Sequence, residues 1–90
     1  MNRFDANQAV LEAVDKVDIS EREKRRVRFA VRFRPRIRQE VAEYVMQECA
    51  VEGIVTEDGT EPVVEWIIIV SYVVQLIAGI VKIIQYFRNR

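Results

Sequence analysis

The sequence predicts an all-α fold of three short helices followed by one long apolar helix. Three observations predict it: apolar residues recur at three- and four-residue spacing, helix start and stop signals separate the segments, and an uncharged run near the C-terminus is too long for one strand. The expected helices cover about residues 5–17, 21–33, 36–51 and 63–88. Ninety residues make one domain at most. A single core of this size is marginal without a partner.

The first two helices follow from capping and periodicity. In residues 5–17, Asp5 or Asn7 can cap a helix whose apolar positions are Val10, Leu11, Val14 and Val17. The second helix begins after Ser20, which with Glu23 forms the capping-box pattern. It ends or kinks at Pro35, which removes a backbone donor and disfavours the α conformation of the residue before it.

The third helix has an apolar ladder and a glycine stop. The ladder is Ile37, Val41, Tyr44, Val45 and Cys49. Phe29 and Phe33 continue it backwards at four-residue steps, so we expect both phenylalanines to pack in the core rather than to stack on nucleic-acid bases. Gly53 is the expected stop, and Asp58-Gly59 the tightest point of a turn.

The last helix combines an apolar seam with a narrow polar stripe. The seam has the three- and four-residue steps of a coiled coil: Trp66, Ile69, Val73, Leu76, Ile80, Ile83 and Phe87. The stripe consists of Ser71, Gln75, Gly79, Lys82 and Gln85. We therefore divide the chain into a charged helical region, 1–61, and a hydrophobic helix, 62–90, which either spans a membrane or forms the core of an oligomer.

Both interpretations of this helix have support. Residues 66–87 could cross a hydrocarbon core, with Trp66 at one end and Tyr86-Phe87 at the other, where interfacial aromatic residues lie. Against a span, Gln75 would need a hydrogen-bond partner near the bilayer centre. The charge bias would also send the basic region across the membrane, although no secretory signal is expected at the N-terminus. Self-association is expected in either case.

The charged residues form two opposed blocks. Residues 22–38 carry nine bases against one acid, a net +8, whereas residues 40–65 carry eight acids and no base, a net −8. Arginine dominates the basic block, and guanidinium groups bind phosphate oxygens in pairs. We expect it to bind phosphates of nucleic acid or anionic lipid, to pair with the acidic block, or to be a solvated face. Its candidate polyanion-binding residues are Arg22, Lys24, Arg25, Arg26, Arg28, Arg32, Arg34, Arg36 and Arg38.

The residues that most enzymes need are scarce. The sequence has no histidine, and its single cysteine, Cys49, has no partner for a zinc site or a nucleophilic pair. Its three glycines are isolated, so no phosphate-cradling loop exists. We expect Cys49 to be a buried apolar residue, and we expect no catalytic residues, metal, cofactor or enzymatic activity.

These expectations combine into a non-enzymatic assembly component. It would self-associate through its apolar helix and dock its arginine block on phosphate or on acidic partners, within a membrane or a large assembly such as a virion. Small virion and phage accessory proteins share this overall pattern, though no specific motif. Two alternatives stay open: a single-span membrane protein of pore-forming or holin-like type, and a nucleic-acid-binding module with an apolar dimerisation helix.

Overall fold

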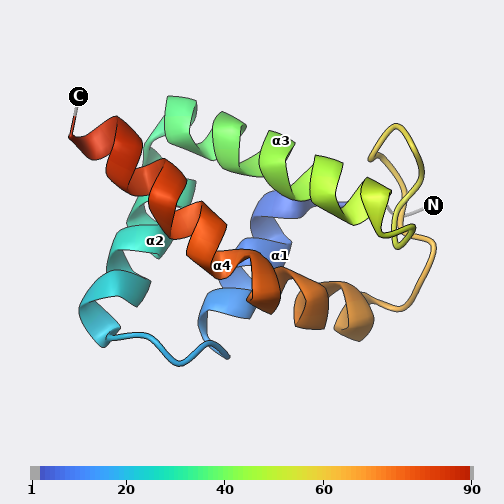
Figure 1. Ribbon diagram of the computed structural model, residues 1–90, viewed down its shortest axis with the longest axis horizontal. Coiled ribbons are helices and arrows are strands. Elements are labelled where there is room, and N and C mark those ends of the chain that lie inside the picture. Colours follow the sequence, from blue (N-terminus) through green and yellow to red (C-terminus); the bar gives the residue numbers. More distant parts are fainter. Residues whose placement is uncertain (1–2, 90) are drawn as a thin grey trace.

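The computed structural model describes residues 3–89, and this part of the chain is all-helical. Its four helices are α1 (Ala6–Val14), α2 (Glu21–Phe33), α3 (Pro35–Val51) and α4 (Trp66–Arg88), with no strand in the described range (Figure 1). The molecule measures 35 × 24 × 20 Å, and α4 contacts all three other helices. The predicted fold class is confirmed.

Side-chain caps set the starts of α1 and α2. The Asp5 carboxylate accepts a hydrogen bond from the Gln8 N–H at 3.0 Å, and the Ser20 hydroxyl accepts one from the Glu23 N–H at 3.1 Å. These bonds satisfy amides that have no partner within the helix. Helix α2 has the predicted bounds, whereas α1 ends at Val14, three residues before its predicted end.

The break at Pro35 is confirmed and involves one residue. Arg34 is extended, with φ −113° and ψ 92°, and Pro35 is already in the first turn of α3, one residue earlier than predicted. Gly53, at φ 75°, ends α3 as predicted. Its N–H donates to Ala50 and the next N–H, that of Ile54, donates to Cys49, which together satisfy the last carbonyls of the helix.

A small hairpin-like loop joins α3 to α4. Val55 and Pro62 form an antiparallel bridge, and the Val63 N–H donates to the Ile54 carbonyl at 3.0 Å. Because these residues belong to the loop, α4 begins at Trp66 and not at residue 63 as predicted. Gly59 turns the tip with φ 74°.

The core lies between α4 and the other three helices. Helix α4 supplies the largest share of buried side chains, which are Ile69, Val70, Val73, Leu76, Ile77, Ile80 and Ile84. They pack with buried residues of α1, α2 and α3, among them Val10, Val31, Val41 and Cys49. Although a single core of this size is marginal without a partner, α1, α2 and α3 cover one full face of α4 within the same chain. Each short helix contributes a narrow strip of small side chains, so three of them can pack closely around one rod.

Candidate functional site

The outward face of α2 carries two exposed phenylalanines that the sequence had placed in the core. Phe29 and Phe33 are 56% and 64% exposed, so the prediction that both lie in the core is wrong. Helix α2 buries Val27, Ala30 and Val31 instead. The extended residue at the Pro35 break lets α2 and α3 rotate independently, so a ladder read across the break does not mark a continuous buried face. The two phenylalanine rings pack against each other, 5.2 Å between centroids.

Beside this pair lies an arginine-lined groove of about 360 Å³, formed by α2, the start of α3 and the end of α4. Arg22, Arg25, Arg26, Arg34 and Arg88 contribute its guanidinium groups. Its apolar lining is Phe29, Ala30, Ile37 and Ile84. Among residues 3–89, no carboxylate lines the groove. An arrangement of several cations around an apolar floor can bind an anion that also carries a flat or apolar group.

The nine predicted polyanion-binding residues separate into three groups. Four of them, Arg22, Arg25, Arg26 and Arg34, line the groove. Three are engaged within the chain: Lys24 lies 3.8 Å from Glu21, Arg28 pairs with Asp15, and Arg36 lies over the ring of Phe87 at 5.4 Å. The remaining two, Arg32 and Arg38, are exposed outside the groove lining.

Arg88 was missing from the predicted set. It lies 50 residues beyond the basic block in sequence, yet the end of α4 folds back beside α2 and brings it into the groove. The only sequence signal for Arg88 was its position in the last turn of a long helix, where a cation is favourable.

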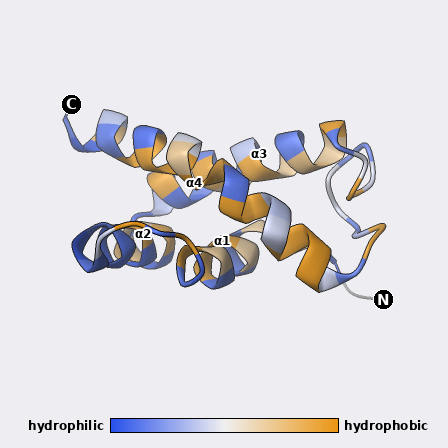
Figure 2. Ribbon diagram, turned by 60° about the horizontal axis from the view of Figure 1, so that its bottom comes forward, coloured by the Kyte–Doolittle hydropathy of each residue, from blue (hydrophilic) through white to orange (hydrophobic). Residues whose placement is uncertain are grey.

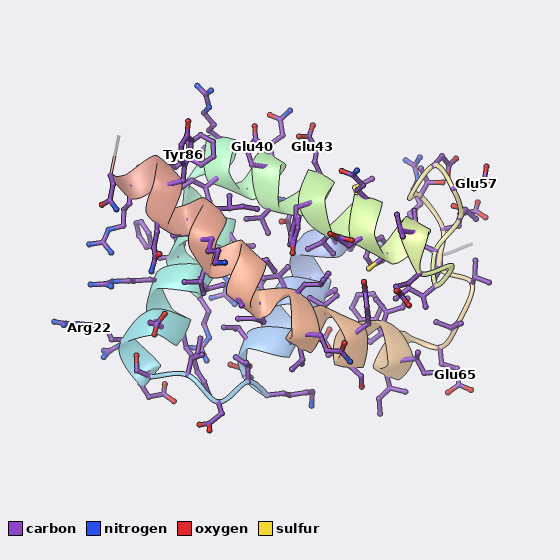
Figure 3. The ribbon with its side chains drawn as sticks, viewed as in Figure 1. Arg22, Glu40, Glu43, Glu57, Glu65 and Tyr86 are labelled. Atoms are coloured by element: carbon purple, nitrogen blue, oxygen red, sulfur yellow. The ribbon has the colours of Figure 1, made fainter. Side chains whose placement is uncertain are left out.

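The expected pairing of the basic block with the acidic block is not made within residues 3–89. The two ion pairs there join Arg28 to Asp15 and Lys24 to Glu21, neither of which belongs to residues 40–65. The hydrogen bond from Arg28 lowers the pKa of the Asp15 carboxyl. Figure 3 shows that parts of the two blocks lie far apart, with Arg22 at one end of the molecule and Glu57 and Glu65 at the other. Glu40 and Glu43 lie between these ends, on the helix that also carries Arg36 and Arg38.

The predicted seam of α4 lies inside a single chain. Ile69, Val73, Leu76 and Ile80 are buried in the core of their own fold. Trp66, Ile83 and Phe87 are half-buried at its edge. A second copy could reach the buried residues only if the four helices separated.

The predicted polar stripe lies mostly on the solvent side of α4. Ser71, Gln75, Lys82 and Gln85 are exposed. Gly79 is half-buried under the Tyr44 ring, where a Cβ atom would lie 2.8 Å from Cζ of that ring. Figure 2 shows the resulting contrast between a hydrophilic α2 and the mostly hydrophobic start of α4.

Two further findings bear on chemistry. Helix α4 is long and apolar enough to cross a membrane. Cys49 is buried, as predicted, and burial together with the charge of Glu48 raises the pKa of its thiol to about 11. A thiol of this kind stays neutral and is a poor nucleophile near neutral pH.

Comparison of the chain with protein-family models, with curated proteins and with solved structures finds no match. Any function must therefore be argued from the groove, the helix faces and the distribution of charge.

Proposed function

We propose that this chain is a non-enzymatic module that binds single-stranded nucleic acid through the arginine-lined groove. The observation that carries the proposal is the placement of five arginines around the exposed ring of Phe29, with no carboxylate among the lining residues. The arginines would contact phosphates, and the ring would stack on a base.

The groove favours a nucleic acid over a lipid bilayer for a geometric reason. Phe29 forms part of the wall of a recess, and its ring leans on that of Phe33. A planar base can enter such a recess and stack on the exposed ring, whereas the flat surface of a bilayer would meet only the rim of the recess. Arg32 and Arg38, exposed outside the groove, extend the positive surface for further phosphates of a polymer.

Binding of a fluorescent oligo(dT) at increasing salt tests the proposal. We expect the logarithm of the affinity to fall linearly with the logarithm of the salt concentration, by about 0.7 for each phosphate contacted. The double variant Arg25→Ala/Arg26→Ala should bind more weakly and show a smaller slope. The matched control, Lys16→Ala/Lys82→Ala, removes the same charge from exposed residues outside the groove and should bind like the unmodified chain.

The base-stacking part has its own test. Phe29→Ala should weaken oligo(dT) binding by about 1–3 kcal/mol without changing the salt slope, because it removes a stacking partner but no charge. Val63→Ala, a truncation of a similarly exposed apolar side chain (61% against 56%) outside both grooves, is the control. If the chain binds vesicles of anionic phospholipid but not the oligonucleotide, the proposed function is wrong.

One observation favours a second candidate, a single-span membrane protein: the length and hydropathy of α4. In that state the seven buried residues of α4 would exchange their contacts with α1–α3 for lipid. Flotation of the purified chain with liposomes, without detergent, tests this candidate. Chain that stays soluble and folded in the absence of lipid would exclude it.

A further inference from the structure

The two ends of the molecule have opposite charge and each exposes apolar side chains. At the arginine end, Phe29 and Phe33 stand among the guanidinium groups of α2. At the other end a second groove, of about 520 Å³, lies between the last turns of α3 and the loop to α4. We call it the acidic groove; its lining residues are Glu43, Met46, Gln47, Ala50, Val51, Glu57, Asp58 and Gly59.

The acidic groove is built as the counterpart of the arginine end. Its floor is apolar, with Val51 75% exposed, and its charged lining residues, Glu43, Glu57 and Asp58, are all acids. The acidic groove has no basic lining residue, and the arginine-lined groove has no acidic one. An apolar floor inside a ring of like charges suits a partner that presents apolar side chains surrounded by the opposite charge.

The loop side of the acidic groove is already ordered. Asp58 accepts hydrogen bonds from the hydroxyls of Thr56 and Thr60, at 2.6 and 2.8 Å, and from the Thr60 N–H at 3.1 Å. These bonds lower the pKa of the Asp58 carboxyl. Gly59 packs on Met46: a Cβ atom added to this glycine would lie 3.2 Å from Cβ of Met46. Because the loop is held in this way, a partner would meet a formed surface and need not order it.

We propose that this chain self-associates head to tail, with the Phe29–Phe33 pair of one copy seated in the acidic groove of the next. The guanidinium groups beside the pair would then face Glu43 and Glu57 of the second copy. This contact uses different surfaces on its two partners, so it repeats and forms an open chain or a closed ring. The seam of α4 plays no part in it and stays in the core of each copy.

A chain of zero net charge could associate at low salt through this contact. Each copy carries one block of +8 and one of −8. Figures 1 and 3 place α2 and the α3–α4 loop at opposite ends of the molecule, so the arginines of α2 and the acids of the loop cannot pair within one copy. Between copies they can, and salt should weaken the contact by screening. An oligonucleotide at the arginine end should compete for the same surface and dissolve the assembly.

Charge reversal at one end at a time gives a decisive test. Glu43→Arg/Glu57→Arg changes the charge of the acidic groove lining from −3 to +1 and leaves the arginine end intact. Arg25→Glu/Arg26→Glu lowers the charge of the arginine groove lining from +5 to +1 and leaves the acidic groove intact. All four side chains are exposed, so both variants should fold, which circular dichroism checks. By sedimentation velocity at low salt, each variant alone should be monomeric, with self-association at least about tenfold weaker than that of the unmodified chain. An equimolar mixture of the two should associate again.

Three results would overturn the proposal: an unmodified chain that stays monomeric at low salt, a variant that associates as well as the unmodified chain, or a mixture that fails to recover. The Glu43→Arg/Glu57→Arg variant separates this proposal from the proposed function. If it no longer associates yet binds oligo(dT), both stand; if the unmodified chain associates but no form binds oligo(dT), only the head-to-tail contact stands.

Discussion

The indole N–H of Trp66 lies 3.0 Å from both carboxylate oxygens of Glu12 and donates to them, joining residues 54 positions apart. The Phe4 ring packs on the same indole, with 6.4 Å between centroids. The start of α4 is thereby attached to α1 by a polar contact as well as by apolar ones. A tryptophan that anchored a helix at a membrane interface would direct its N–H toward lipid headgroups.

Replacing Glu12 by alanine should destabilise the fold by about 1–3 kcal/mol, because the half-buried Trp66 N–H loses its acceptor. Glu12→Gln is the matched control, since the amide oxygen can still accept this bond. Urea unfolding followed by the fluorescence of Trp66, the single tryptophan, measures both variants. Equal stability of the alanine and glutamine variants would mean that the Trp66–Glu12 bond contributes nothing.

Ile80→Ala should lower the free energy of unfolding by about 2–5 kcal/mol, because it opens a cavity among residues of the same chain. The control is Ile67→Ala on the same helix, which is 68% exposed and should change stability by no more than about 0.5 kcal/mol. The comparison is made by denaturant unfolding at high salt, where single copies prevail. If the two variants lose similar stability, α4 does not use the predicted face as its core face.

Gln75→Leu tests where the polar stripe points. Gln75 is exposed to solvent, so the substitution should leave stability within about 0.5 kcal/mol of the original value and should not drive the chain into liposomes. Stability and flotation are measured side by side. Strong insertion of the variant, with loss of the soluble fold, would favour the membrane candidate.

The Cys49 thiol should make the fold less stable in alkali. Its pKa is raised from 9.0 to about 11 by burial and by Glu48, so the native state keeps its proton while the unfolded state loses it. The resulting stability is fully present below pH 9 and is lost as the pH rises toward 11. Burial raises the pKa values of Tyr44 and Tyr72 as well, and they act in the same direction.

Cys49→Ala should therefore unfold more easily at neutral pH, because it leaves a small cavity, yet its stability should fall less steeply with pH. Urea midpoints measured across this range compare the two chains. An identical alkaline slope would show that the thiol does not titrate with the fold.

Local signals allowed much of the fold to be predicted. Ser20, Pro35 and Gly53 act on their own neighbours in the chain, so their effects do not depend on tertiary contacts, and all three predictions are confirmed. The start of α4 was misplaced because the bridge between Val55 and Pro62 depends on a pairing that no local pattern records.

The candidate site was less predictable, because it depends on how helices are rotated and folded back. The core side of α2 is set by Val27, Ala30 and Val31, which are smaller than the phenylalanines that were preferred. In a crowded bundle, small residues allow close helix contact, and the larger Phe29 and Phe33 remain outside. The contribution of Arg88 to the groove depends on the antiparallel return of α4, which follows only from the assembled fold.

The central claim is that the apolar face of α4 is the core of a single folded chain. Amide hydrogen exchange, read by NMR in detergent-free buffer at high salt, tests it most directly. We expect the amides of residues 69–84 to exchange only through global unfolding and to be the best protected in the molecule. Rapid exchange of those amides in buffer, with protection acquired only when lipid or detergent is added, would contradict it.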